Sequence, residues 1–365
     1  MIDFRSRVRG CLLGGAIGDA LGAPVEFRSL AEIRARCGDG GVREYLPYEG
    51  TFGAVTDDTQ MTLFTVEGLI RAGVRTDRGI GFTVGTVHAA YDRWLDTQRL
   101  PGPPADASGF LARQPWLYAR RAPGTTCLTA LTEARRGADR PRQYGGQADN
   151  DSKGCGTVMR SAPFGLLPDR PVDYLFDMAV TAAGYTHGHR TGQLAAGAFA
   201  ALVDGLRRGA DLPDAVDGAR RLLATYDGHE ETTAALDAAV RAARERPATA
   251  ETVESLGGGW IAEEALAIGV YAALAKPGPD QVTDALALAV THSGDSDSTG
   301  SVCGNILGAW HGEEALPPEL AFEVEGRGVI GEIADDLVWE FTPAHRRLHG
   351  DHGPHTRWIR RYPGG

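Results

Sequence analysis

Two short segments place carboxylates and hydroxyls directly before amphipathic helical runs. One is TDDT, beginning at Thr56, and the other is GDSDSTG, beginning at Gly294. Taken alone, each is explained by helix N-capping, because Asp, Ser and Thr are preferred caps and the helix dipole favours negative charge there. Two such segments, both free of nearby Lys and Arg, instead form a hard oxygen donor set that suits Mg²⁺, Mn²⁺ or Ca²⁺. The candidate metal ligands are Thr56, Asp57, Asp58, Asp295, Asp297 and Ser298.

A third segment is rich in glycine and runs into a predicted helix. It comprises Ser152, Lys153, Gly154, Cys155, Gly156 and Thr157. A glycine-rich turn of this kind offers backbone N–H groups that can cradle a diphosphate. At Gly154 we also expect a positive φ, which a β-branched side chain would oppose. The segment lacks the spacing of a P-loop, which argues against a nucleoside triphosphatase of that type.

The first predicted helix carries glycine at every fourth position, at Gly10, Gly14, Gly18 and Gly22. The run imitates a dinucleotide-binding fingerprint, but no strand precedes it, so we reject a Rossmann site and expect close helix packing. Two acids, Asp19 and Glu26, lie in or just after this helix. Glu26 is a candidate site residue only because the other segments indicate a site.

Helical periodicity in Ala-, Leu- and Val-rich segments dominates the chain, and strand-like alternation is almost absent. The sequence therefore predicts an all-α fold. Helices are expected over about 5–21, 58–72, 80–95, 126–135, 171–184, 190–207, 211–225, 230–245, 260–274, 280–291, 297–310 and 328–341. We expect one domain over 1–342 and a basic, His- and Gly-rich tail over 343–365. Metal binding by the tail histidines is disfavoured by the glycines between them, so a solvated tail is predicted.

The composition excludes several classes of protein. With 42% apolar and 23% charged residues among 365, the chain is typical of a soluble globular protein, and neither a membrane span nor a signal peptide is expected. Five scattered cysteines without a C-x-x-C pair indicate reduced thiols and a cytoplasmic location. The net charge of -11 argues against nucleic acid as a partner. An anionic small ligand would need local help from metal ions, helix N-termini or backbone amides.

Taken in order, six segments of this chain resemble the ADP-ribosylglycohydrolase family. They are GCLLGGAIGDALGAPVEF, TDDTQMTL, SKGCGTVMRSAP, THGH, GGGWIAEEALAIGVYAAL and HSGDSDSTGSVCGNILGA, and they span about residues 8–311. The resemblance implies a single, orthogonally packed all-α domain with a binuclear Mg²⁺ centre at the base of a cleft, where Mn²⁺ can substitute. It also implies that the ligand is the ADP-ribose moiety of a modified protein or small molecule.

The same resemblance assigns roles to individual residues. The segment from Thr56 to Asp58 matches the first group of metal ligands, and the segment from Asp295 to Ser298 matches the second, with Ser298 standing where many relatives have threonine. Glu26 matches an acid near the metals and the scissile bond.

On the substrate side, the segment from Ser152 to Thr157 matches the diphosphate loop and His187 matches a histidine that contacts the ligand. Lys153 stands where some relatives carry an aromatic residue, so Trp260 becomes the candidate for adenine stacking. Taken alone, without the resemblance, His187 would be more typical of a structural histidine.

The implied function is Mg²⁺-dependent hydrolysis of the glycosidic bond between ADP-ribose and an acceptor, with protein arginine as the first expectation. Two metals would orient the ribose hydroxyls and lower the pKa of a bound water, while a carboxylate takes its proton. Glu26, Asp57 and Asp58 are the candidates for that role, without a ranking. The alternatives are hydrolysis of serine-linked, O-acetyl or nucleic-acid-linked ADP-ribose, a non-catalytic ADP-ribose-binding relative, and an unrelated metal-dependent phosphohydrolase.

Overall fold

The computed structural model describes residues 2–136, 146–342 and 356–364, and within these ranges it consists of helices and connecting loops. The α-helices are α1 (Phe4–Gly22), α2 (Leu30–Cys37), α3 (Asp57–Asp77), α4 (Gly85–Thr97), α5 (Thr125–Arg136), α6 (Ala162–Gly165), α7 (Val172–Gly184), α8 (Arg190–Arg207), α9 (Leu212–Leu223), α10 (Glu230–Glu245), α11 (Ala250–Glu254), α12 (Ala262–Ala275), α13 (Val282–Val290), α14 (Ser296–His311), α15 (Pro318–Glu323), α16 (Arg327–Glu340) and α18 (Thr356–Arg361). The all-α prediction is confirmed. Every helix expected from periodicity is present, with ends that differ by at most five residues.

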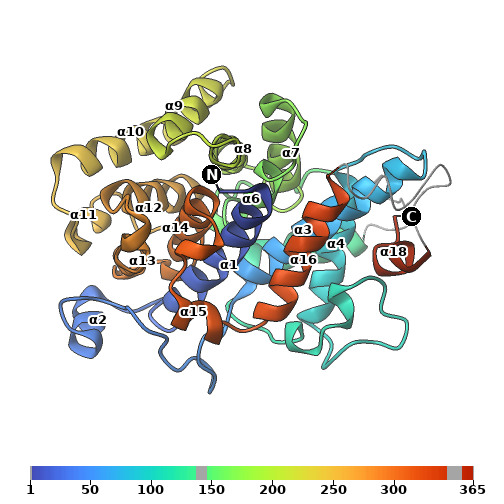
Figure 1. The fold of residues 1–365 in the computed structure, drawn as a ribbon, viewed down its shortest axis with the longest axis horizontal. Coiled ribbons are helices and arrows are strands. Elements are labelled where there is room, and N and C mark those ends of the chain that lie inside the picture. Colours follow the sequence, from blue (N-terminus) through green and yellow to red (C-terminus); the bar gives the residue numbers. More distant parts are fainter. Residues whose placement is uncertain (1, 137–145, 343–355, 365) are drawn as a thin grey trace.

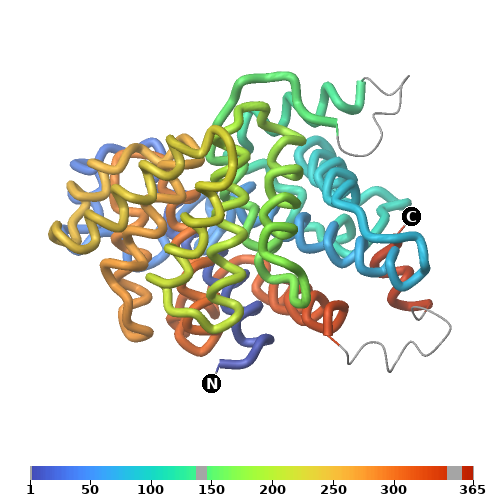
Figure 2. The backbone as a smooth tube through the Cα atoms, turned by 90° about the horizontal axis from the view of Figure 1, so that it is seen from above, coloured from blue at the N-terminus to red at the C-terminus, as the bar shows by residue number. Residues whose placement is uncertain are grey.

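The helices are arranged around three central ones. In Figures 1 and 2, α9 to α13 gather at one end of the molecule, while α3, α4 and α18 lie toward the other, with α1 and α14 between them. Buried residues follow one another without a break over 57–74 in α3, 296–309 in α14 and 10–22 in α1. A helix that is buried on all sides is held rigidly by its neighbours. The three helices that carry the acidic segments are therefore held by neighbours on all sides along these stretches.

Helices α1 and α14 pack against each other in antiparallel fashion through glycine. A Cβ atom added at Gly18 would clash with the carbonyl oxygen of Gly300, and one added at Gly22 would clash with Ser296 at the start of α14. Gly14 meets Gly304 and Gly10 meets Gly308 in the same way. The prediction of close helix packing from the four-residue glycine repeat is thus confirmed. Because the helices run in opposite directions, the end of α1 lies beside the beginning of α14.

The helices that periodicity did not predict are short. Helix α2 is defined by a capping box between Ser29 and Glu32, and α6, α11 and α15 span at most six residues each. Eight residues make barely two helical turns and six or fewer do not reach two, so none of these segments carries a clear repeat of apolar residues. Caps and tertiary contacts, which the pattern does not encode, decide their conformation.

The prediction of a solvated C-terminal tail is wrong for the part of it that the structure describes. Helix α18 packs onto α16: the indole N–H of Trp358 donates to Glu340 at 2.7 Å, and the Tyr362 hydroxyl donates to Asp336. Tyr362 is completely buried. Two aromatic side chains among the arginines supply the apolar surface that the basic composition concealed. The histidines at 345, 349, 352 and 355 lie outside the described residues, and the domain boundary at 342 stays a prediction.

Two expectations about the environment of the chain can be compared with the structure. All five cysteines, Cys11, Cys37, Cys127, Cys155 and Cys303, are free thiols. Among the helices that the structure describes, none combines the length and the apolar character needed to cross a bilayer.

Candidate metal and ligand site

Three helix ends meet at the predicted metal site. Thr56 caps α3, its side chain accepting from the backbone N–H of Asp58 at 3.3 Å. Asp295 caps α14, accepting from the N–H of Ser298 at 3.3 Å. The C-terminal end of α1 and the loop that follows it lie between these two starts, because α1 pairs with α14. The acidic segments are therefore N-caps and also parts of one cluster.

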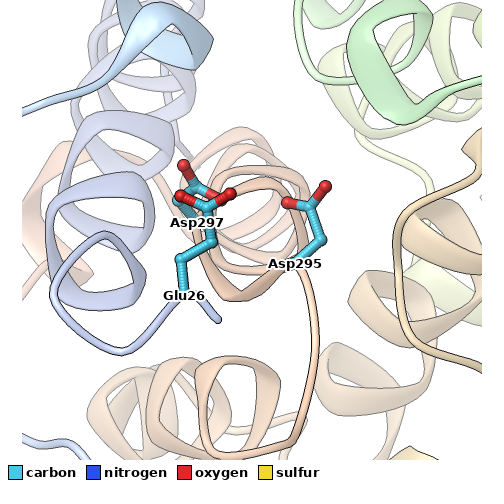
Figure 3. Close-up of side chains that lie close together, drawn as sticks. All are labelled: Glu26, Asp295 and Asp297. Atoms are coloured by element: carbon cyan, nitrogen blue, oxygen red, sulfur yellow. The ribbon is translucent and has the colours of Figure 1, made fainter. Parts of the chain in front are cut away.

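The carboxyl groups of Glu26, Asp295 and Asp297 form the centre of this cluster. One oxygen from each lies within 4.8 Å of the others, and Figure 3 shows the three carboxyl groups turned toward the same side. Asp297 and Asp295 are almost fully buried, whereas Glu26 is half-buried. Asp58 is also buried, and its Oδ2 has no hydrogen-bond partner among the described residues. A buried carboxylate oxygen without a donor is costly, which indicates that a bound cation completes the site.

The electrostatics of the cluster lead to the same conclusion. Burial, followed by the charge of Asp297, raises the pKa of Asp57, Asp58 and Asp295 well above the usual aspartate range. Burial, followed by the same charge, raises the pKa of Glu26 to about 10. These acids disfavour one another's ionised forms in the absence of a cation. The donor set consists of carboxylates and hydroxyls, which fits hard divalent ions such as Mg²⁺ and Mn²⁺.

Asp19 is a site residue that the sequence did not select. Its carboxylate accepts from the backbone N–H of Thr56 at 3.1 Å, from the Thr56 hydroxyl at 2.9 Å and from the N–H of Thr59 at 3.1 Å. The Thr59 hydroxyl also donates to it. Because the Thr56 hydrogen is directed to Asp19 and one lone pair accepts from the N–H of Asp58, the second lone pair of the Thr56 hydroxyl is left for a metal ion. A lone acid within an apolar, glycine-rich helix was the available signal, since a buried carboxylate requires several donors.

A cavity of about 290 Å³ opens directly over the cluster. Of the residues selected from the sequence, its lining includes Glu26, Asp57, Asp58, Cys155, Gly156, Trp260, Asp295, Asp297 and Ser298. Thr56 is fully buried beneath the cavity and does not line it. The structure thus brings the two acidic segments, the glycine-rich segment and Trp260 to one place, although they are far apart in the chain.

The glycine-rich segment is held by the chain that enters α12. The backbone N–H of Cys155 donates to the carbonyl of Trp260 at 3.0 Å, and the N–H of Gly154 donates to the Ser152 hydroxyl at 3.3 Å. From Gly154 to Thr157, Gly156 is the residue whose N–H has no acceptor among the described residues, and it lines the cavity. Over the whole predicted segment, from Ser152 to Thr157, the N–H of Lys153 is the other one without an acceptor among the described residues, so the predicted row of free amides is reduced to two, of which that of Gly156 faces the cavity.

The expectation of a positive φ at Gly154 is wrong, because the angle is -58°. Glycine is required there by contact instead: an added Cβ would lie 3.2 Å from Nε2 of His187. At Gly156 an added Cβ would lie 3.0 Å from both Cε1 of His187 and the Cys127 sulfur. The segment rests on the edge of the His187 ring, and a side chain at Gly154 or Gly156 would fit only if the ring shifted by a few tenths of an ångström.

His187 lies beneath the glycine-rich segment as a neutral imidazole. It is buried, and its Nδ1 is 2.7 Å from the Thr186 hydroxyl. Burial, and then the charge of Arg160, lower the pKa of His187 to about 3. The residue does not line the cavity, so it reaches a ligand only through the edge of the ring beside Gly154 and Gly156.

Lys153 points away from the cavity. Its ammonium is bound by Glu263 at 2.6 Å and by Glu231 at 2.7 Å, and these residues belong to α12 and α10. The side chain therefore anchors the glycine-rich segment to two helices. Cys155 does face the cavity, where its thiol donates to Oδ2 of Asp295 at 2.8 Å. Burial raises the pKa of that thiol well above its usual value, so it is not a ready nucleophile.

Trp260 stands at the mouth of the cavity, stacked on Phe27. The ring centroids are 5.1 Å apart with an interplanar angle of 29°, and both rings are exposed to solvent. Phe27 directly follows Glu26 and has a φ of 64°, which is rare for an aromatic residue. Sequence reasoning missed Phe27, because an exposed aromatic residue in a loop gives no pattern. The pair forms an aromatic rim beside the carboxylates.

Comparisons with known proteins show relatives of this chain in sequence and in fold. A model of the ADP-ribosylglycohydrolase family matches residues 1–346. An uncharacterized protein of Archaeoglobus fulgidus is 28% identical over 203 residues, which make up 54% of this chain and 54% of the archaeal protein, so this chain spans about half the length of that relative. A solved structure described as an ADP-ribosylglycohydrolase-related protein complex superimposes with a TM-score of 0.67 at 25% identity, covering 93% of this chain and 99% of the other. The resemblance inferred from the six sequence segments is confirmed.

Proposed function

This chain belongs to the ADP-ribosylglycohydrolase family, and from that premise we propose that it hydrolyses the bond between ADP-ribose and a protein arginine with the help of two Mg²⁺ ions. Membership supports the hydrolysis of ADP-ribose conjugates in general. The arginine acceptor and the Mg²⁺ requirement are the parts that we add.

The observation that carries the proposal is the acidic cluster beneath an open cavity. The oxygens of Glu26, Asp295 and Asp297 converge within 4.8 Å, and a buried oxygen of Asp58 has no partner among the described residues. The residues that would hold the ions are Thr56, Asp57, Asp58, Asp295, Asp297 and Ser298. When bound, the ions would neutralise the carboxylates, orient the ribose hydroxyls and make a water molecule more acidic.

Among the three candidates for the acid/base role, the geometry favours Glu26. Asp57 accepts from the N–H of Gly124 at 3.2 Å and belongs with Asp58 to the first turn of α3. Glu26 is on a loop, is half-buried and faces the cavity, so its carboxyl group can exchange a proton with a water molecule there. The remaining carboxylates would stabilise the positive charge that develops on the ribose as the glycosidic bond breaks.

The other half of the cavity suits the remainder of ADP-ribose. We place the diphosphate against the glycine-rich segment, with the free N–H of Gly156 as a donor and His187 beneath it. Trp260 and Phe27 form the rim. Aromatic faces close to carboxylates suit a planar cation, which supports an arginine guanidinium as the acceptor and makes adenine stacking on Trp260 the alternative use of the same ring.

A panel of defined conjugates tests this proposal. The protein is incubated with arginine-linked and serine-linked ADP-ribosyl peptides, O-acetyl-ADP-ribose and ADP-ribosylated nucleic acid, each with Mg²⁺ or with a chelator, and both products are identified by mass spectrometry. We expect intact ADP-ribose and unmodified arginine, formed only with Mg²⁺. Preference for another conjugate would overturn the arginine assignment. Release of AMP or inorganic phosphate would indicate a phosphohydrolase.

We further propose that the protein acts in the cytoplasm and that residues 1–342 form the catalytic domain. Five free thiols, including Cys155 inside the cavity, suit a reducing compartment.

A further inference from the structure

Arg160 is a buried cation without a carboxylate partner. It follows the glycine-rich segment by three residues and is 1% exposed. In the part of the chain that the structure describes, no carboxylate lies within ion-pair distance of its guanidinium. The two other buried arginines are different, since Arg71 pairs with Glu67 at 2.6 Å and Arg121 pairs with Glu325. An arginine stays protonated even when buried, so this positive charge has no direct ion-pair partner and interacts with a carboxylate only at longer range, with that of Asp57.

The groups around the Arg160 guanidinium are weak partners. One terminal nitrogen lies 3.2 Å from the Cys127 sulfur and 3.5 Å from the Met61 sulfur, and the carbon of the guanidinium lies 4.6 Å from the centre of the Tyr91 ring. None of these groups is ionised at neutral pH. Burying a charge among such neighbours is unfavourable unless an anion completes the arrangement. The fold thus keeps a buried charge whose direct contacts among the described residues are all neutral.

Two short paths connect this charge to the glycine-rich segment. The other terminal nitrogen of Arg160 donates to the Thr186 hydroxyl at 2.5 Å, and that hydroxyl is 2.7 Å from Nδ1 of His187. The second path is the Cys127 sulfur, which contacts Arg160 on one side and the space beside Gly156 on the other. One layer of side chains therefore separates the guanidinium from Gly156, which lines the cavity.

The hydrogen-bond directions along the first path define the tautomer of His187. The Thr186 oxygen accepts from Arg160, and its own hydrogen has two acceptors within reach, Nδ1 of His187 at 2.7 Å and the Ala183 carbonyl at 3.4 Å, of which Nδ1 is the nearer. A neutral imidazole that accepts at Nδ1 carries its proton at Nε2. Nε2 is the atom that lies against Gly154. The ring therefore presents an N–H, and not a lone pair, to the segment that faces the ligand.

We propose that Arg160 is the electrostatic counterpart of the ligand's diphosphate, and that it acts with Thr186 as a positioning pair that holds His187 as an Nε2–H donor beneath the glycine-rich segment. This inference rests on the proposed function, because it takes the diphosphate of ADP-ribose as the anion. It assigns to Arg160 the positive charge that an otherwise acidic cavity lacks. Interactions through a buried layer of this kind are screened less than those at the surface.

Binding measurements on the Mg²⁺-loaded protein test the inference. ADP-ribose and ADP, which share the diphosphate, are titrated calorimetrically into wild type, Arg160→Met and Arg160→Lys. We expect Arg160→Met to lower the affinity for both ligands by about tenfold or more. Arg160→Lys should retain most of the wild-type affinity because it keeps the charge. Mn²⁺ affinity, titrated separately into the metal-free protein, should stay the same. In turnover, KM should rise while kcat changes little.

The melting temperature separates this role from a structural one. Arg160→Met removes a buried charge that has no direct ion-pair partner and fills the space with an apolar chain, so the metal-free variant should melt no lower than wild type. Thr186→Val keeps the charge of Arg160 and removes the hydrogen bond to His187. The affinity for ADP-ribose should therefore fall by about threefold. If Arg160→Met does not fold, Thr186→Val decides: a loss of ADP-ribose affinity at unchanged Mn²⁺ affinity supports the inference.

Three results would overturn the inference: wild-type ADP-ribose affinity in folded Arg160→Met, equal losses in the Met and Lys variants, or an unchanged affinity in Thr186→Val. Each leaves the proposed function intact. A wild-type protein that binds ADP-ribose but hydrolyses no conjugate would contradict the proposed function and leave the role of Arg160 standing. The two failures are therefore distinguishable.

Discussion

The two halves of the cavity, one around Asp297 and the other around Gly156, differ in charge. Around Asp297 the chain gathers carboxylates for which the described residues supply no ion-pair partner, and burial together with the charge of Asp297 raises the pKa of Asp57, Asp58 and Asp295. Around Gly156 the chain supplies a free amide, a neutral histidine and the buried charge of Arg160. One half has an excess of negative charge that metal ions can neutralise. The other carries its own positive charge for an anionic ligand.

This difference teaches which part of the site depends on a cofactor. Under the proposed function the acidic half is completed by cations, so its stability and its activity should both respond to metal. The half around the glycine-rich segment is complete in the protein itself, apart from Lys153, whose charge is used by Glu231 and Glu263. Changes in one half should therefore leave the binding property of the other half unaffected.

The strongest way to break the comparison is to remove a carboxylate. Asp297→Ala and Asp57→Ala should each lower hydrolysis by roughly 1,000-fold or more, because a metal ligand and its charge are lost. The metal-free variants should melt at or above the wild-type temperature, since like-charge repulsion is relieved. Asp284→Ala removes an exposed carboxylate outside the cavity and serves as the control. A sharply lower melting temperature for Asp297→Ala would show that capping is the main role.

Asp19→Asn tests a carboxylate that, in our account, positions Thr56 without binding a metal ion itself. The amide keeps the shape but offers one acceptor oxygen to the donors of Thr56 and Thr59, so the Thr56 hydroxyl loses its fixed direction. We expect Mn²⁺ affinity to fall by about 10- to 100-fold, as is typical for groups behind the ligands. Calorimetric titration measures it, with ADP affinity as the control from the other half. Equal losses of Mn²⁺ and ADP affinity would contradict a local effect.

Gly154→Val tests the other half of the comparison. The new side chain would press on Nε2 of His187, so ADP-ribose affinity should fall by about tenfold while Mn²⁺ affinity is unchanged. Gly102→Val adds the same side chain in open space and is the matched control. Unchanged ADP-ribose affinity in a folded Gly154→Val protein would remove this segment from the site.

The smallest expected effect is the pH dependence of the metal-free protein. The acids of the cluster have folded-state pKa values above their unfolded ones, with Asp19 raised to about 7 and Glu26 to about 10. The folded state then binds more protons than the unfolded state, so stability falls as pH rises from about 4 toward neutrality and beyond. The melting temperature of chelator-treated protein should drop by several degrees between about pH 5 and 8, and Mg²⁺ should flatten the slope. A metal-free melting temperature that rises over this range would contradict the raised pKa values.

The sequence was most informative about features that depend on interactions between residues close together in the chain. Long helices such as α8 and α14 repeat their apolar residues over several turns, so their positions could be predicted within a few residues. The two acidic segments could be recognised because residue types that cap a helix stand directly before its apolar repeat in the sequence. Their convergence depended on the glycine repeat of α1 finding its partner in Gly300, Gly304 and Gly308, and this pairing brings Glu26 between them.

The residues that sequence reasoning missed depend on contacts between distant parts of the chain. Lys153 is turned from the cavity by Glu231 and Glu263, which no local pattern relates to the glycine-rich segment. Arg160 could be counted from the sequence as a charged residue, but only the packed structure shows that none of the described carboxylates forms an ion pair with it. The role of a buried charge is decided by what surrounds it.

One measurement tests the division of the cavity most directly: an anomalous-difference map from crystals of the protein grown with Mn²⁺ and ADP-ribose. Our account predicts two Mn²⁺ peaks between the segments that begin at Thr56 and Asp295, with oxygen ligands alone, and the diphosphate against Gly156 and His187, above Arg160. Cysteine or histidine in the metal coordination sphere, a map without Mn²⁺ between the two segments, or a diphosphate bound directly by the metal ions would contradict it.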